Sequence, residues 1–259
     1  MGDRASVVSS FTVIKGALID ETYAVLARWD FDRSKTANLE TLRELNYIGA
    51  GSATWLRDVS HVINRRYEPA SRDRALALLA KASLPMADWR PILLWHMTRD
   101  EFLVRDFLSN WLFDSYEDGA FRLRSEDLWA YLRDISTRGG VTEHAWSENT
   151  VKHTASSLLK MAVDFGLMKG TMRREFAGYH LPEQSFIYLL HALRDTGLAP
   201  RQVIHSPEWR MYLMRPADVE RELLRLHQYR RLRYEAAGSI VELELPRQSA
   251  LEYAEDMVA

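Results

Sequence analysis

A predicted helix in the middle of the chain carries polar and basic side chains along one face. Apolar residues recur at helical spacing from Val151 to Ala162 and predict the buried face. The opposite face presents Asn149, Lys152, His153, Ser156 and Lys160. Amide and hydroxyl groups can hydrogen-bond base edges, and ammonium groups bind phosphates. The pattern therefore predicts a helix that enters a groove of DNA.

The elements expected around this helix support the same prediction. A short strand over 121–123, a helix from about 125, a loop, the helix above and a small hairpin follow one another. This order is typical of a winged helix-turn-helix domain, in which the later helix enters the major groove and the hairpin contacts the backbone. Three cations on or beside the hairpin are predicted to contact DNA: Lys169, Arg173 and Arg174. An ordinary amphipathic helix followed by a turn stays open as the alternative, because the link over 138–146 is longer than usual.

Two further basic groups are predicted to contact DNA. One follows a turn over 46–52 between two predicted helices and contains Arg57, Arg65 and Arg66. The other lies between a predicted helix from Pro216 and a hairpin over 232–245, and contains Arg230, Arg231 and Arg233. For this C-terminal group the alternative is ion pairing of its arginines with Glu220, Glu222 and Glu235.

Signatures of catalysis are missing from the sequence. There is no phosphate-binding loop, dinucleotide fingerprint, zinc-protease motif or serine-hydrolase motif, and there is no cysteine. The eight histidines are scattered singly, without the spacing of metal ligands. Asp30 and Asp32 could hold Mg²⁺ or simply lie at a solvated helix end, and Glu242 with Glu244 fits an exposed strand face. We predict no enzymatic activity, no metal and no cofactor.

Helical periodicity dominates the rest of the chain and sets the expected architecture. Apolar stripes at spacings of three and four run through the first 97 residues, and Thr98 with Glu101 fits a capping box that would begin the next helix. We predict a mainly α, multi-helix protein with winged helix-turn-helix-like modules and one or two small β-hairpins. Three parts are expected: an N-terminal helical domain over 1–97, a central winged-helix-like domain over 98–181 and a C-terminal helical region with a hairpin over 182–259.

The charge composition leaves a polarised binding face open. The 259 residues include 34 basic and 36 acidic side chains, a formal net charge of -2, and 28 of the basic residues are Arg. Near-neutrality excludes indiscriminate attraction to nucleic acid or anionic membrane. Locally, however, residues 138–174 carry +3 and residues 201–233 carry +4, against -5 over 235–259. No apolar run approaches the roughly 20 residues that span a bilayer, so we expect a soluble, cytoplasmic protein.

Three segments resemble the BrxA family of bacterial bacteriophage-exclusion (BREX) defence systems. They are residues 10–18 (SFTVIKGAL), residues 55–67 from WLR to RRY, and residues 158–167 from LLK to GL. The resemblance covers most of the chain. It implies a small, mostly helical, non-enzymatic cytoplasmic protein with winged-helix-like parts that binds DNA. Descriptions of the family also liken it to a helical RNA-binding antitermination factor, and some call it membrane-associated, a label without support in these residues.

We therefore predict a double-stranded DNA-binding accessory protein of a phage-defence system, which binds mainly through phosphate contacts. Two alternatives stay open. The chain could be an RNA-binding, antitermination-like helical factor, or a scaffold that recruits other phage-defence proteins through acidic and aromatic surfaces.

Overall fold

Serine caps begin three of the first four helices of the chain. In the computed structural model, which describes residues 6–142, 144–238 and 240–258, the hydroxyls of Ser9, Ser34 and Ser52 each accept a hydrogen bond from a backbone N–H three residues later. Asn46, with φ of 42°, ends α3, and the predicted turn over 46–52 follows it. The helices are α1 (Ser10–Lys15), α2 (Ile19–Ala27), α3 (Lys35–Leu45), α4 (Ala53–Arg66), α5 (Arg74–Lys81) and α6 (Met86–Met97).

The middle third contains short helices, one long helix and a small hairpin. The elements are α7 (Phe102–Asp106), the π-helix η1 (Phe107–Leu112), α8 (Phe113–Glu117), η2 (Ser125–Leu128), α9 (Trp129–Arg133), η3 (Ile135–Arg138), α10 (Glu148–Asp164), β1 (Met168–Lys169) and β2 (Glu175–Phe176). The predicted capping box is wrong. The Thr98 hydroxyl donates to the carbonyl of Trp95 at the end of α6, and the Glu101 carboxylate binds the buried Arg66 instead of a helix N-terminus.

The last third adds helices and a second hairpin. The elements are α11 (Glu183–Arg194), α12 (Pro200–Ile204), η4 (Pro207–Tyr212), α13 (Pro216–Gln228), β3 (Arg233–Ala237), β4 (Ile240–Glu244) and α14 (Ala250–Met257). Strands β3 and β4 pair antiparallel, with Tyr234 opposite Leu243. Ser239, in the turn predicted between them, lies outside the described residues. The prediction of a mainly α chain with small β-hairpins is confirmed.

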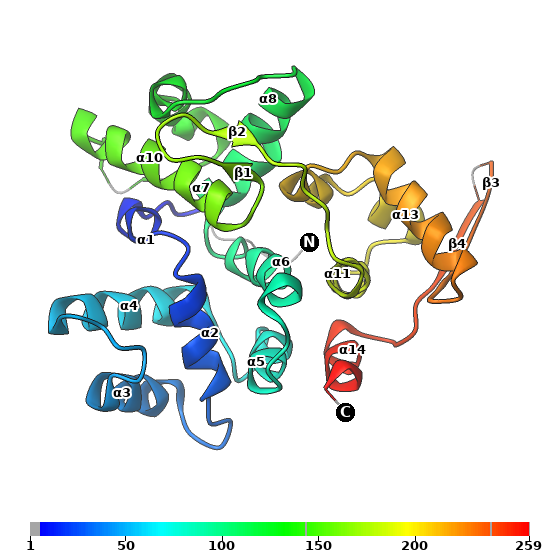
Figure 1. Ribbon diagram of the computed structural model, residues 1–259, viewed down its shortest axis with the longest axis horizontal. Coiled ribbons are helices and arrows are strands. Elements are labelled where there is room, and N and C mark those ends of the chain that lie inside the picture. Colours follow the sequence, from blue (N-terminus) through cyan, green and yellow to red (C-terminus); the bar gives the residue numbers. More distant parts are fainter. Residues whose placement is uncertain (1–5, 143, 239, 259) are drawn as a thin grey trace.

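Buried apolar side chains from every part of the chain belong to one contiguous core. Trp89 and Trp95 of α6 are buried in it, together with Trp209 of η4. Helix α14 packs on α5 and α11, so the end of the chain returns to the N-terminal third (Figure 1). The domain boundaries predicted at 97/98 and 181/182 stay predictions.

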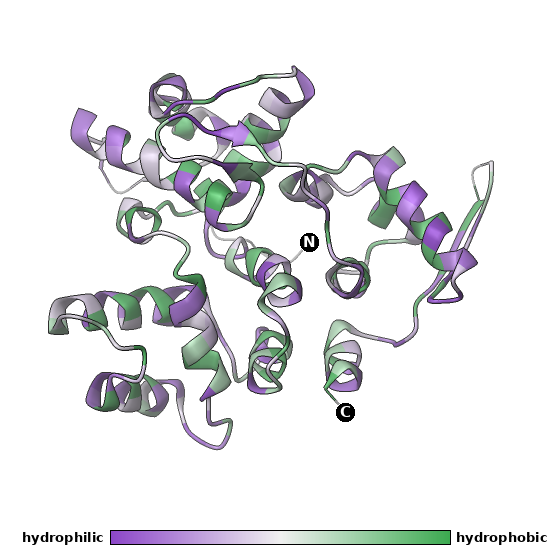
Figure 2. Ribbon diagram, in the orientation of Figure 1, coloured by the Kyte–Doolittle hydropathy of each residue, from purple (hydrophilic) through white to green (hydrophobic). Residues whose placement is uncertain are grey.

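Most helices have a hydrophobic and a hydrophilic side, and the hydrophilic sides of α3, α10 and α13 face outward (Figure 2). This distribution is that of amphipathic helices which bury one stripe in a common core. Of the helices that the structure describes, none combines the length and the apolar character needed to cross a bilayer.

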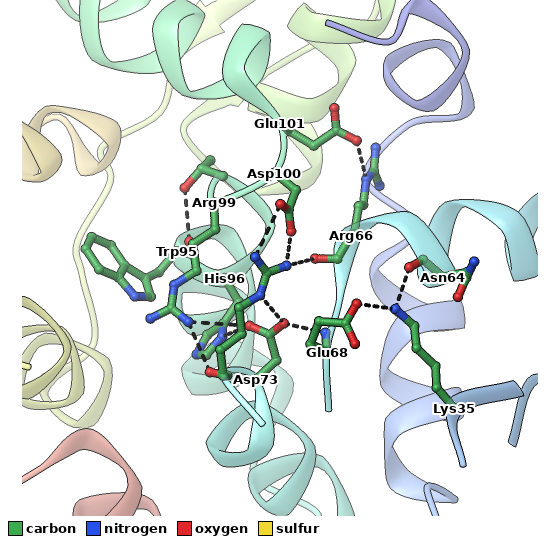
Figure 3. Close-up of polar contacts among 12 residues, drawn as sticks. Lys35, Asn64, Arg66, Glu68, Asp73, Trp95, His96, Arg99, Asp100 and Glu101 are labelled. Carbon is green, nitrogen blue, oxygen red and sulfur yellow. Dashed lines mark hydrogen bonds and ion pairs between the residues drawn. The ribbon is translucent and has the colours of Figure 1, made fainter. Parts of the chain in front are cut away.

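A buried polar chain connects α5, α6 and α11. Asp73, which precedes α5, lies 2.6 Å from Nδ1 of His96, and Nε2 of His96 lies 2.8 Å from the Tyr188 hydroxyl. Asp73 also accepts hydrogen bonds from the backbone N–H of Glu68 and from the side chain of Arg72 (Figure 3). These contacts give every buried polar atom of His96 a partner, which buried polar groups require.

A second buried cation, Arg66 at the end of α4, ties the N-terminal segment to the start of α7. Its Nε donates to the Glu101 carboxylate at 2.8 Å, and its Nη atoms donate to the carbonyls of Gly16 and Thr12, both at 2.9 Å. Neither Arg66 nor Glu101 reaches the surface. The pair therefore holds α1, α4 and α7 together as a structural element.

Candidate nucleic-acid interface

Helix α10 is positioned by a serine cap and by one apolar face. The Ser147 hydroxyl accepts a hydrogen bond from the backbone N–H of Thr150 at 3.1 Å, and Glu148 places a carboxylate in the first turn. The predicted buried face is confirmed, since Val151, Ala155, Leu158 and Ala162 are all in the core. Helix α1 covers one flank, where Ser157 reaches the carbonyl of Ile14.

The opposite face of α10 is exposed along its whole length. All the side chains predicted for it lie at the surface: Asn149, Lys152, His153, Ser156 and Lys160. From Asn149 to Lys160 the stripe spans about 16 Å at the rise of an α-helix. That length fits within the major groove, which accepts an α-helix.

Neighbouring side chains set the charge of this face. The ammonium of Lys152 lies 5.3 Å from the centre of the Trp129 ring, a cation–π contact that leaves its charge unneutralised. Lys160 forms an ion pair with Asp164 at 2.6 Å, although its side chain stays 65% exposed. Exposed pairs of this kind are weak, so Lys160 can exchange its carboxylate for a phosphate.

The β1–β2 hairpin lies beside α10 and is held by a third strand segment. Leu123 and Arg174 exchange two backbone hydrogen bonds of 2.9 and 3.0 Å, and Met168 pairs with Phe176. Of the strand predicted over 121–123, only Leu123 forms a β-bridge, which pairs it with Arg174. At the turn, Gly170 has φ of 97°, and a Cβ there would lie 2.5 Å from the carbonyl oxygen of Arg173. The hairpin therefore requires glycine at this position.

The three cations predicted on the hairpin differ in exposure. Lys169 and Arg173 are exposed on either side of the turn, beside Met172, which is 86% exposed. Arg174 is only 8% exposed, because its strand position turns the side chain inward. That Arg174 contacts DNA stays a prediction.

The N-terminal basic group is divided by burial. The side chain of Arg57 is 71% exposed, and Arg65 is half-buried, with one Nη donating to the carbonyl of Val7. Arg66 is fully buried and is bound by Glu101. The prediction that Arg66 contacts DNA is corrected, because it has no surface to offer. Helix α1 packs on α10 and on α4, the helix that carries Arg57 and Arg65 (Figure 1).

The C-terminal basic group is largely ion-paired. Arg231 pairs with Glu183 at 2.8 Å, and Arg233 pairs with Glu235 at 2.9 Å and Glu244 at 3.4 Å. Arg230 is exposed. The pairs of Arg225 with Glu222 and of Arg233 with Glu235 agree with the ion-pairing alternative. The group lies at the opposite end of the molecule from α10 (Figure 1), so the three basic groups do not form one surface.

The acidic candidates have local structural partners. The Asp30 carboxylate accepts the backbone N–H of Asp32, and the Asn38 side chain bonds both the N–H and the carbonyl of Asp30. This is the arrangement of a turn before α3. Within the described part of the chain, no group of three or more carboxylate and imidazole side chains is arranged to hold a metal ion.

The BrxA family model matches residues 9–192, well over half of the chain. The chain belongs to the BrxA family. Membership implies a protein of the bacteriophage-exclusion phage-defence systems. Comparisons with curated proteins and with solved structures gave no significant match.

The range matched by the BrxA family includes α1, α4, α10 and the β1–β2 hairpin, and it ends within α11. The C-terminal basic group, with the ion-paired Arg231 and Arg233, lies beyond it. The exposed face of α10 and the hairpin cations are therefore part of the BrxA-like segment.

One cation near the hairpin was missed by sequence reasoning. Arg124 is exposed and stands directly before η2, where it faces the β1–β2 turn across a groove. The sequence places Arg124 directly before Ser125, where a helix was predicted to begin, and this position could have marked it as a cation close to the hairpin.

Proposed function

We propose that this BrxA-family protein is a non-enzymatic, cytoplasmic, double-stranded DNA-binding accessory protein of a BREX phage-defence system. One observation carries the proposal: the exposed face of α10 combines two lysines with short polar side chains and lies next to a hairpin with exposed cations. A helix face with this chemistry suits phosphates and base edges together.

The order of elements supports a winged helix-turn-helix interpretation. A helical segment from α7 to α8, a strand bridge at Leu123, the short helices η2 and α9, helix α10 and the β1–β2 hairpin follow one another. The long link before α10 departs from the usual pattern. Its start is fixed by Arg138, whose Nε donates to Asp106 at 2.9 Å and whose Nη2 donates to the carbonyl of Tyr131 at 2.7 Å.

Phosphate contacts are expected to supply most of the affinity. Lys152, Lys160, Lys169 and Arg173 provide exposed cations, while Asn149 and Ser156 are the groups on α10 best suited to hydrogen-bond bases. Binding through backbone contacts depends steeply on salt and only weakly on sequence.

Fluorescence anisotropy with a labelled duplex at about 50 and 200 mM salt tests the proposal. We expect binding that weakens with salt, and a loss of at least tenfold in affinity for a Lys152→Glu/Lys160→Glu variant. The matched control is Arg43→Glu, an exposed arginine on α3 at the far side of the molecule from α10 (Figure 1).

Three results would contradict the proposal. They are absence of binding at low salt, equal loss of affinity in the Arg43→Glu control, and displacement of the duplex by structured RNA at much lower concentration than by unlabelled DNA. The last result favours the RNA-binding alternative.

A further inference from the structure

A groove separates the β1–β2 turn from η2 and α10, and we call it the wing groove. It is lined by Arg124, Ser125, Glu126, Ser156, Gly170, Thr171, Met172, Arg173 and Arg174. We infer that the wing groove binds one phosphate of the DNA backbone, with Arg174 as the buried cation and with Arg124 and Arg173 at the opening. This inference rests on the proposed DNA-binding function.

The strongest observation is that Arg174 is a buried cation without a partner. Its side chain is more than nine-tenths buried, and its Nε has no hydrogen-bond partner. No carboxylate of the described residues lies within 4.0 Å of its guanidinium. A buried charge is costly unless it is paired, and burial here lowers the pKa of the Arg174 guanidinium, an effect that the Asp164 carboxylate opposes from a longer range.

Arg66 shows how this fold treats a buried arginine that has a structural role. Glu101 neutralises its charge, and the carbonyls of Thr12 and Gly16 accept its remaining donors. Among the described residues, no carboxylate hydrogen-bonds Arg174 as Glu101 does Arg66, and Asp164 acts on it only at longer range. The Nε of Arg174 is itself buried, which leaves its Nη atoms as the donors for an anion from outside.

The backbone fixes where the Arg174 guanidinium lies. Arg174 and Leu123 exchange two backbone hydrogen bonds, and Gly170 permits the tight turn that brings Arg173 and Arg174 back to the groove. A cation held in this way loses little conformational freedom when it binds an anion. A planar guanidinium also binds two phosphate oxygens at once, which an ammonium cannot do.

The charge and position of the wing groove favour a phosphate that belongs to DNA. The three arginines face one carboxylate, Glu126, so the lining carries a net charge of +2. Ser156 is the residue shared by the wing groove and the exposed face of α10. A duplex that receives α10 in its major groove therefore brings a backbone phosphate to the opening of the wing groove.

The test is an Arg174→Met variant, compared with Arg43→Met as the control. Removing an unpaired buried charge should leave the melting temperature equal to or above that of the wild type. DNA affinity should nevertheless fall about tenfold, and the slope of log affinity against log salt should fall by about 0.9, the value for one lost phosphate contact. Arg174→Lys should recover only part of the loss.

The outcomes separate this inference from the proposed function. If the wild type binds DNA and Arg174→Met binds with the same affinity and slope, the phosphate site is refuted and the proposed function stands. If the wild type does not bind DNA, both fail. Inorganic phosphate added at constant ionic strength distinguishes the source: a rise in melting temperature that depends on Arg174, without DNA binding, means that a free anion is the ligand and overturns the assignment to DNA.

A second variant keeps the test decisive if Arg174→Met does not fold. Arg124 and Arg173 are exposed, so an Arg124→Ala/Arg173→Ala variant is expected to fold normally. A loss of affinity of about tenfold or more in this double variant supports the wing groove as the phosphate site. An unchanged affinity refutes it.

Discussion

The Nε2 atom of His96 lies 2.8 Å from the hydroxyl of Tyr188, and this contact joins α6 to α11 in the core. Because Asp73 accepts the hydrogen on Nδ1 of a neutral imidazole, Nε2 is left as the acceptor for Tyr188. A neutral His96 therefore uses both ring nitrogens in this chain.

Stability should therefore fall on mild acidification. Burial lowers the pKa of His96 below its usual value of 6.5 in the folded state, so the unfolded chain binds the proton more tightly. Stability from this group is present above about pH 6.5 and decreases as the pH falls below it. Denaturation at pH 7.5 and 5.5 measures the effect. A His96→Gln variant should lose this part of the pH dependence, whereas the exposed His153→Gln should behave as the wild type.

Asp73 should cause a second loss of folding stability at lower pH. Hydrogen bonds and charge from His96, with further support from Glu68 and Arg72, outweigh burial and lower the pKa of Asp73 to about 2. The unfolded carboxyl titrates near 3.8. The stabilisation is therefore present above about pH 4 and is lost between about pH 4 and pH 2. If an Asp73→Asn variant still lost the same stability between about pH 4 and pH 2, Asp73 would not be the group responsible.

Tyr188→Phe isolates the hydrogen bond itself. The ring fills the same space, but Nε2 of His96 loses its partner in the core. We expect a loss of about 1–2 kcal/mol in the free energy of unfolding, measured by urea denaturation at pH 7.5. Tyr229→Phe, at a tyrosine that is 68% exposed, is the matched control and should be neutral.

Arg66 should prove essential to stability and not to DNA contact. Arg66→Met leaves the buried Glu101 carboxylate with the Thr12 hydroxyl but without its cation, and the free energy of unfolding should fall by about 3–5 kcal/mol. Arg57→Met, on the exposed side of the same helix, should change it by less than about 0.5 kcal/mol. An Arg66→Met protein as stable as the wild type would contradict the structural role.

Two glycines offer a direct test of the hairpin geometry. Gly170→Ala should cost about 1–3 kcal/mol and weaken DNA binding, because the new Cβ collides with the Arg173 carbonyl and the backbone has a positive φ. Gly178→Ala meets no atom within 4 Å and has no such backbone constraint. Equal DNA affinity and stability for the two variants would argue against this geometry.

The C-terminal arginines should contribute little to DNA binding. Arg231 and Arg233 are bound to carboxylates, and the hairpin that carries Arg233 lies far from α10 (Figure 1). We expect an Arg230→Ala/Arg231→Ala/Arg233→Ala variant to bind DNA within about twofold of the wild type, measured by anisotropy at low salt. A tenfold loss would place a second contact surface at this end.

Local patterns predicted the mainly helical character of the chain, both hairpins and the exposed face of α10, but not helix α14. Spacing of three and four residues determines which side of α10 is buried, and that signal is contained within one segment. The burial of Arg66 and Arg174 could not be predicted from local spacing, because it depends on residues far away in the sequence. Arg66 is held by Glu101, 35 residues later, and Arg174 pairs with Leu123. Charge counting along the chain treats paired, buried and free arginines alike, so it could not separate the three basic groups.

The carboxylates around Arg233 have a consequence for how the molecule meets its target. Glu235, Glu242 and Glu244 share one exposed face of the β3–β4 hairpin and outnumber the single arginine between them. We expect this face of the hairpin to repel DNA, while the proposed contact at α10 draws the duplex to the opposite end of the molecule (Figure 1). We expect the molecule to rotate during approach and to arrive with α10 foremost, an orientation effect on the association rate that salt suppresses.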